Sequence, residues 1–170
     1  MNLKEFDRAV NFCSDEPDWF GVPLRESQDI ELIDPVMWFT HDYFISLCKQ
    51  TYPDRQVFSR ILHITSGRHT ENSAHPRGLA IDEVIVGLTF LEASLLALGT
   101  RMNHGPLGFG FYPFSRPPFI HYDFKDWDRE VNRCLLWYRD VEGEYKNNAR
   151  DPDLVTQKLH EWEGIPMRGR

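Results

Sequence analysis

The chain has 170 residues, 41% of them hydrophobic and 14% aromatic, which is enough apolar material for one globular domain with a sizeable core. Its formal net charge is -7, from 26 acidic and 19 basic residues. This acidic balance argues against a nucleic-acid partner, because binding to a phosphate backbone needs clustered lysine and arginine.

Helices are predicted in the first third of the chain. Residues 2–13 carry apolar side chains at helical spacing, and residues 14–34 are rich in Asp, Glu, Pro, Gly and Ser, as loops are. Asp34 and Pro35 predict the cap and first turn of a second helix, which ends near Gln50.

Short strands are predicted in the middle of the chain, where Val, Ile, Phe and Tyr alternate with polar residues or glycine. One helix interrupts them over residues 89–98, and Gly99 is expected to end it. The predicted strands cover residues 57–65, 79–84, 107–112 and 119–124.

A long helix is predicted over residues 127–146, with Val131, Leu135 and Tyr138 on one face, and a short helix over residues 154–162. Helices therefore come first, short strands fill the middle and helices close the chain. That order predicts an α+β fold with a small, mainly antiparallel sheet flanked by N- and C-terminal helices.

Targeting and redox signals are sparse. The first residues lack the basic and apolar regions of a secretory signal, and no apolar run reaches the roughly 18 residues of a membrane span. We therefore expect a protein that is cytoplasmic when made. Cys13, Cys48 and Cys134 are far apart and form no Cys-x-x-Cys pair, so we expect buried free thiols.

Residues 73–82 form the most informative motif, because they place His75 and Asp82 seven positions apart. Imidazole and carboxylate groups are zinc ligands, provided that they converge from different points of the backbone. Gly78 permits backbone torsions that a side chain would resist, and Ala80 leaves room on the strand face that it shares with Asp82. The motif thus predicts two ligands of a metal site.

A second pair, His121 and Asp123, lies two residues apart on a predicted strand, so both side chains point to one face. We expect His121 to be the third ligand in a two-histidine, one-carboxylate zinc site that leaves a position for water. Asp123 is then free to orient a ligand or to act as general base.

The pattern Ser73-x-His75-x-x-Gly78-x-Ala80-x-Asp82 resembles the signature of the D-Ala-D-Ala metallopeptidases, zinc peptidoglycan peptidases related to lysostaphin-type peptidases and the hedgehog signalling domain. His121-Tyr122-Asp123 resembles the strand that carries their last histidine. The Gly-x-Gly-x-Tyr run over residues 108–112 and the Ser-Gly step over residues 66–67 are similar to further family segments, so that the resemblance covers roughly residues 57–125.

This resemblance implies zinc at His75, Asp82 and His121 and cleavage of peptide bonds in bacterial peptidoglycan peptides. Residues 1–150 would form a single zinc-peptidase-like domain with its core in residues 57–125, and residues 151–170 a tail or short helix. Many relatives are phage or bacterial lysis enzymes. A chain without a signal would suit that role, released to the wall through a lysis pore or carried in a virion.

Two positions depart from the family pattern. An arginine that holds substrate commonly follows Ser-Gly-aromatic; here Arg68 comes one place early and His69 takes its usual position. Some relatives carry an acidic base three residues before the last zinc histidine, where this chain has Pro118. We therefore expect Asp123 to be the base, with Arg68 or His69 steadying the substrate or the oxyanion.

The sequence leaves two functions open. The first is a zinc metallopeptidase of carboxypeptidase or endopeptidase type acting on peptidoglycan. The alternative is a catalytically inactive zinc-binding module with a binding or virion-structural role, which the departures at Arg68 and Pro118 favour.

Overall fold

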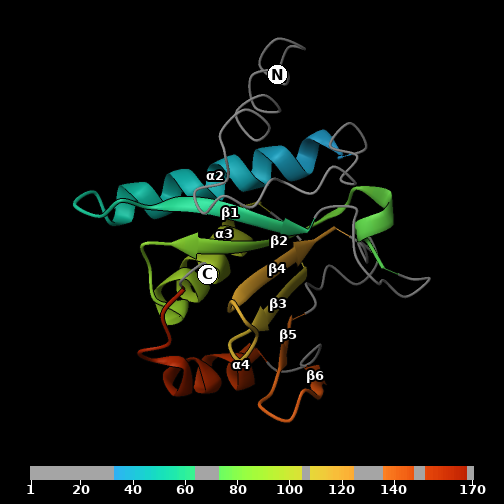
Figure 1. Ribbon diagram of the computed structural model, residues 1–170. Coiled ribbons are helices and arrows are strands. Elements are labelled where there is room, and N and C mark those ends of the chain that lie inside the picture. The colour runs from blue at the N-terminus through green and yellow to red at the C-terminus, as the bar shows by residue number, and fades with distance from the viewer. Residues whose placement is uncertain (1–32, 64–72, 105–107, 125–135, 148–151, 168–170) are drawn as a thin grey trace.

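The computed structural model describes residues 33–63, 73–104, 108–124, 136–147 and 152–167 (Figure 1). Its centre is a six-stranded sheet in the order β1-β2-β4-β3-β5-β6. Neighbouring strands run antiparallel, except that β3 and β5 are parallel. The predicted α+β class is thereby confirmed. The strands are β1 (Phe58–His63), β2 (Ala80–Val86), β3 (Gly108–Tyr112), β4 (Phe119–Asp123), β5 (Leu136–Arg139) and β6 (Tyr145–Asn147).

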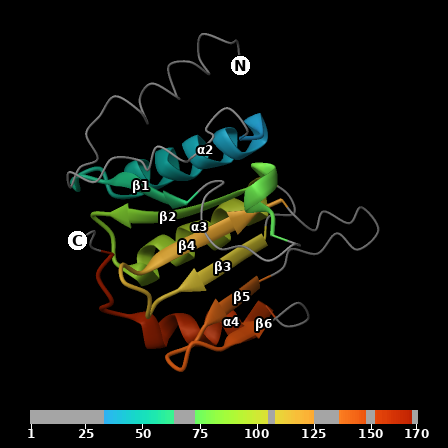
Figure 2. The ribbon, with the colours of Figure 1, turned by 45° about the vertical axis from the view of Figure 1, so that its right-hand side comes forward.

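Within the described residues, three helices accompany the sheet: α2 (Pro35–Thr51), α3 (Phe90–His104) and α4 (Pro152–Leu159). Figures 1 and 2 show α2 beside β1, α3 behind the central strands and α4 beside β5. Two short 3-10 turns, η2 (His75–Arg77) and η3 (His160–Trp162), complete the described elements. None of these helices is both long and apolar enough to cross a bilayer.

The core lies between the helices and one face of the sheet. Alternate strand residues, such as Phe109 and Phe111 of β3, are buried on that face. The Trp162 ring joins them, with ring centroids 5.4 Å from Phe90, 5.6 Å from Phe111 and 5.8 Å from Tyr138. The end of the chain therefore packs into the same core as the central strands.

The start of α2 follows its sequence signals. The Asp34 carboxylate accepts a hydrogen bond of 2.9 Å from the Val36 backbone N–H, and Pro35 occupies the first turn. The predicted short helix over residues 154–162 is confirmed as α4 and η3. The predicted helix over residues 2–13 lies outside the described residues.

The predicted helix over residues 127–146 is wrong from residue 136 onward, where the chain forms β5 and β6; residues 125–135 lie outside the described residues. Leu136 and Tyr138 face the core, which is the two-residue period of a strand. Gly143, with φ of 86°, sits in the turn between the strands, a conformation that side chains resist. Over residues 136–146 the helical spacing of apolar residues in the sequence therefore does not correspond to a helix.

The sequence predicted that Gly99 would end α3. This prediction is wrong, because the helix continues through Gly99 to His104. A glycine inside a helix costs about 1 kcal/mol relative to alanine, which tertiary packing overrides. Here Thr100 is fully buried and its hydroxyl donates to the Leu96 carbonyl at 2.9 Å, within the helix. Packing around Thr100 therefore outweighs the local glycine signal.

A buried polar network joins α2 to the face of the sheet that packs against the helices (the helical face). His41 Nδ1 lies 2.9 Å from Glu83 Oε2 and 3.1 Å from the Tyr122 hydroxyl. The Ser59 hydroxyl donates to Glu83 as well, whereas Glu83 Oε1 has no hydrogen-bond partner among the described residues. Cys48 of α2 is a buried free thiol. Burial raises its pKa to about 12, and the negative charge of Glu83 adds to the rise.

The protonation of His41 follows from this network. Burial disfavours the charged imidazole, but the charge of Glu83 and its hydrogen bond outweigh burial, so the pKa of His41 is raised above 6.5. Asp42 adds to the rise and Lys49 opposes it. The pair therefore stabilises the fold fully below pH 6.5, and its contribution is lost as the pH rises through the folded pKa.

We expect His41→Leu to lower the free energy of unfolding by about 3 to 5 kcal/mol at pH 6, because it leaves Glu83 buried without its cation. The deficit should shrink as the pH is raised toward 9. Urea unfolding measures both effects. The control His160→Leu changes an exposed histidine and should shift stability by less than about 0.5 kcal/mol. A His41→Leu protein as stable as this control would contradict the ion pair.

Candidate metal centre

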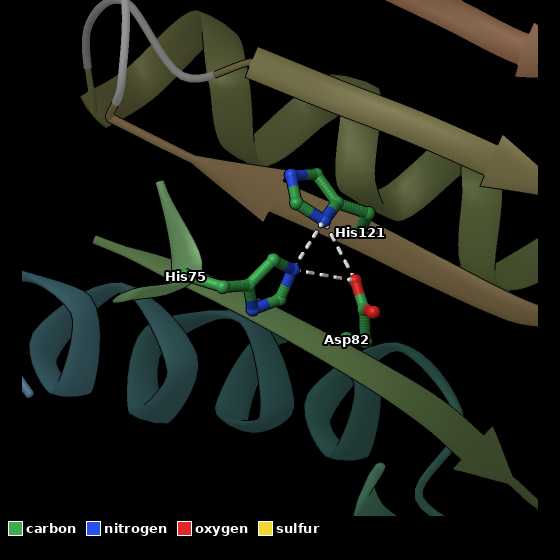
Figure 3. Close-up of side chains that lie close together, drawn as sticks. All are labelled: His75, Asp82 and His121. Atoms are coloured by element: carbon green, nitrogen blue, oxygen red, sulfur yellow. Dashed lines mark hydrogen bonds and ion pairs between the residues drawn. The ribbon is translucent and has the colours of Figure 1, made fainter. Parts of the chain in front are cut away.

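Three side chains from separate elements meet on the sheet face away from the helices (Figure 3). His75 comes from η2, Asp82 from β2 and His121 from β4. Asp82 and His121 are direct partners in the antiparallel register of β2 and β4, so their side chains leave the sheet side by side. All three are buried, with exposures of 3%, 7% and 7%.

The three donor atoms fit a metal ion. His75 Nε2 lies 3.2 Å from His121 Nδ1 and 3.4 Å from Asp82 Oδ1, and the last two atoms are 2.6 Å apart. A tetrahedral zinc site with bonds of about 2.0–2.2 Å separates its ligand atoms by about 3.3–3.6 Å. One separation, 3.4 Å, falls in this range, and a second, 3.2 Å, lies just below it. The third is a charge-assisted hydrogen bond, which a metal would lengthen.

The turn that carries His75 explains the remaining motif residues. The Ser73 hydroxyl accepts from the His75 backbone N–H at 3.3 Å. Gly78 ends the turn at φ of 68°, the left-handed conformation that glycine adopts without strain. Its carbonyl accepts from the Asp34 N–H at 3.1 Å, and the Leu79 carbonyl accepts from the Phe124 N–H at 3.0 Å. The turn is thus fastened to α2 and to the end of β4.

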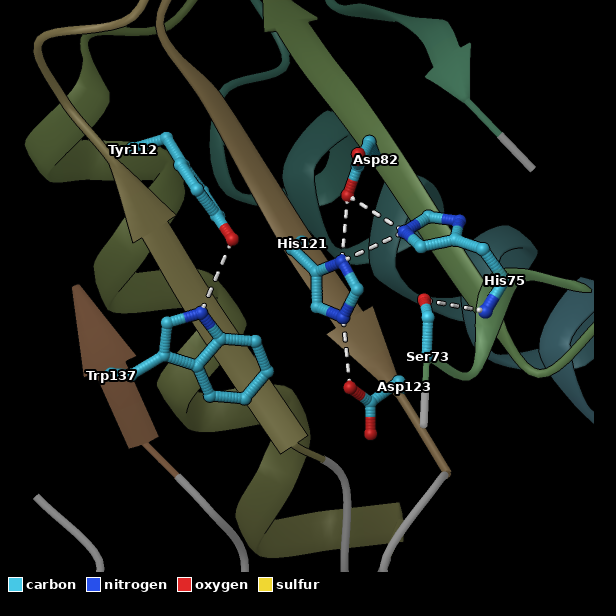
Figure 4. A network of polar contacts seen from close by, with 7 residues as sticks. All are labelled: Ser73, His75, Asp82, Tyr112, His121, Asp123 and Trp137. Carbon is cyan, nitrogen blue, oxygen red and sulfur yellow. Dashed lines mark hydrogen bonds and ion pairs between the residues drawn. The ribbon is translucent and has the colours of Figure 1, made fainter. Parts of the chain in front are cut away.

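Asp123 binds the far side of the His121 ring. Its Oδ2 lies 2.8 Å from His121 Nε2, while His121 Nδ1 faces Asp82 and His75 (Figure 4). Carboxylates that receive the second N–H of a metal-binding histidine fix its tautomer and orientation. Of the two roles that the sequence left open, the geometry favours orientation of the ligand; the role as general base stays a prediction.

The site is strongly coupled electrostatically. Burial opposes charge on His121, yet the charge of Asp82 and the hydrogen bonds of Asp123 and Asp82 raise its pKa to about 9. Burial also opposes charge on Asp82, and the two histidines hold its pKa well below the usual range. Metal binding would displace the proton from a ligand imidazole, and a divalent cation would balance the negative charges of the Asp82 and Asp123 carboxylates.

Two glycines of β3 make room for neighbouring side chains on this face. A Cβ at Gly108 would lie 2.8 Å from Asp123 Oδ1, and a Cβ at Gly110 would lie 2.4 Å from Cε2 of Trp137. A side chain at either position would force Asp123 or Trp137 to move, so this arrangement of the two side chains favours glycine at both positions. A role for Trp137 was not predicted from the sequence, although two glycines alternating in one strand signal close packing across it.

The two candidate substrate-binding residues, Arg68 and His69, lie outside the described residues. His63 stands opposite Asp82 in the β1–β2 register, beside an irregularity in the pairing. His41 lies on the helical face and belongs to the network with Glu83. The group that could hold a metal within the described residues is therefore His75, Asp82 and His121.

Comparisons of the chain with protein-family models, with curated proteins and with solved structures find no match. The case for a metal centre therefore stands on the geometry of the three side chains and on the motif that carries them.

We expect the protein to bind one divalent ion, and Asp82→Asn or His75→Ala to weaken that binding by more than about 100-fold, because only two ligands remain. Calorimetric titration with Zn²⁺ measures the affinity. Asp54→Asn and His160→Ala alter exposed residues and are matched controls that should bind like the wild type. Unchanged affinity in Asp82→Asn would remove this site as the metal centre.

Proposed function

We propose that the protein is a zinc-dependent peptidase that hydrolyses peptide bonds in the stem or cross-link peptides of bacterial peptidoglycan. The observation that carries the proposal is the buried convergence of His75, Asp82 and His121, two imidazoles and one carboxylate. A three-ligand set is typical of catalytic zinc, whereas structural zinc is usually held by four protein ligands. The resemblance of residues 73–82 and 121–123 to the D-Ala-D-Ala metallopeptidases supports the substrate class.

Zinc in this site would polarise the scissile carbonyl and lower the pKa of water toward neutrality. The chain's own residues would keep the site ready for that chemistry. Asp82 and the two imidazoles supply the donor atoms, while Asp123 retains the proton on His121 Nε2, so that Nδ1 offers its lone pair. Imidazole and carboxylate also suit Fe²⁺, so metal analysis of protein purified without chelator is the first measurement.

Substrate contacts are proposed from the sequence for Arg68 and His69. Both precede the turn of His75 by fewer than ten residues, so they belong to the segment that leads directly into the metal ligands. A guanidinium or imidazole there would hold the substrate carboxylate or the developing oxyanion. A peptidase of this kind would serve in lysis of a bacterial wall.

A second function has a specific observation in its favour: a zinc-binding module without catalysis, with a binding or virion-structural role. Both oxygens of the Asp123 carboxylate face other groups, since Oδ2 contacts His121 and Oδ1 packs over Gly108. The position three residues before His121 is Pro118, which has no acidic group. If the protein is such a module, the metal would stabilise the sheet and a partner would bind beside the metal site.

Turnover separates the two functions. We expect zinc-loaded protein to release new amino termini or free D-amino acids from purified peptidoglycan, detected by amine labelling and mass spectrometry of the products. A chelator should abolish the release and added zinc restore it, and Asp82→Asn should be inactive while Asp54→Asn is active. One equivalent of bound zinc without turnover on any peptidoglycan type would favour the non-catalytic module.

We expect Asp123→Asn to weaken zinc binding by about 10- to 100-fold, as loss of a carboxylate behind a ligand histidine does. At saturating zinc we expect kcat to remain within about tenfold of the wild-type value. Loss of a general base would lower kcat by about 10²–10⁴, whereas loss of a group that only orients a ligand would lower it less. Zinc affinity and kcat are measured on the same preparation. A fall of 10² or more in kcat with zinc affinity intact would instead assign the proton transfer to Asp123.

A further inference from the structure

Trp137 of β5 lies across the sheet beside the metal centre, although it is outside the segment that resembles a zinc peptidase. Its ring centroid is 5.1 Å from that of His121, with the planes tilted by 54°. It points to the same face as Asp123 and His75 in Figure 4, whereas its neighbours Leu136 and Tyr138 are buried on the helical face.

The register explains how the two rings meet. Trp137 is the partner of Gly110 in the parallel β3–β5 pair, and Gly110 is the partner of His121 in the β3–β4 pair. The three residues therefore form a row across three strands. Backbones two strands apart are separated by about 9.5 Å. Their rings reach 5.1 Å only because the residue between them has no side chain.

A second contact holds the indole in this position. Trp137 Nε1–H donates to the Tyr112 hydroxyl at 3.3 Å. The Tyr112 ring is stacked on Phe119 with centroids 4.2 Å apart and planes 11° apart. Trp137 cannot turn away from His121 without giving up this hydrogen bond, and Tyr112 cannot follow without giving up its stacking.

The contacts on His121 then enclose the imidazole. Asp82 faces Nδ1, Asp123 faces Nε2 and the His75 ring approaches at a centroid distance of 4.9 Å. Trp137 contributes the large apolar contact. Hydrogen bonds in the ring plane limit rotation about the Cβ–Cγ bond, and a flat apolar ring against the imidazole limits its tilt.

We infer that Trp137 is a positioning residue of the metal centre, holding His121 so that Nδ1 points at the ion, and that β5 completes the site. The inference rests on the metal site of the proposed function and not on its peptidase activity. It also gives a reason for Gly110: any larger residue would meet the indole at 2.4 Å and push it from His121.

The test compares Trp137→Leu and the conservative Trp137→Phe with Trp162→Phe, which alters a buried tryptophan on the helical face. Each protein is titrated with Co²⁺, whose visible absorption reports ligand geometry, and Zn²⁺ affinity is obtained by competition. Urea unfolding of the metal-free proteins measures stability separately.

For Trp137→Leu we expect binding about 10- to 100-fold weaker than in the wild type and an altered cobalt spectrum, as for loss of other groups that orient a metal ligand. Trp137→Phe should recover part of the affinity, and Tyr112→Phe should have a smaller effect in the same direction. Trp162→Phe should lower stability yet keep the wild-type spectrum and affinity within about threefold.

Wild-type cobalt spectrum and affinity in Trp137→Leu would overturn the inference, as would an equal loss of affinity in Trp162→Phe. Failure of the proposed function can be distinguished from failure of this inference. A wild type that binds metal without cleaving peptidoglycan would contradict the peptidase activity, and the role of Trp137 would still be decided by the metal titrations. A wild type that binds neither Zn²⁺ nor Co²⁺ overturns the metal site and this inference together.

Discussion

The antiparallel pairing of β2 with β4 determines both polar clusters of the protein. Asp82 stands opposite His121 in that register, and strand alternation sends the next residues, Glu83 and Tyr122, to the opposite face. One face therefore receives two of the candidate metal ligands and the other receives the groups that bind His41 of α2. A shift of one residue in this pairing would exchange the two faces and destroy both clusters.

Buried charge on both sides of the same strands is expensive unless it is balanced. On the helical face the His41 imidazole balances Glu83, and on the other face, in our proposal, a divalent ion balances Asp82 and Asp123. Buried ion pairs contribute little net stability, but they penalise every arrangement that separates them. In this molecule they specify which strands lie together more than they add to the free energy of folding.

The three candidate metal ligands could be predicted from the sequence because they lie in two short motifs. In addition, the alternation of side chains along a strand can be recognised from a few residues. The cap of α2 at Asp34 was predictable for the same reason. The strand at Leu136–Arg139 was not, since apolar residues nearby also fit a helical period, and its pairing with β3 and β6 is what makes a strand there favourable. Contacts between strands distant in sequence, such as Trp137 with His121, follow from register. The glycines of β3 indicate close packing but not which residue packs there.

The row of Trp137, Gly110 and His121 also couples two positions that lie far apart in the sequence. A Cβ at Gly110 would lie 2.4 Å from the indole, so a side chain there is accommodated only if Trp137 moves. A smaller residue at position 137 would remove this obstacle, so the cost of substituting Gly110 depends on which residue occupies position 137. The two positions therefore act as one unit of the sheet, and the effect of changing either is defined only together with the other.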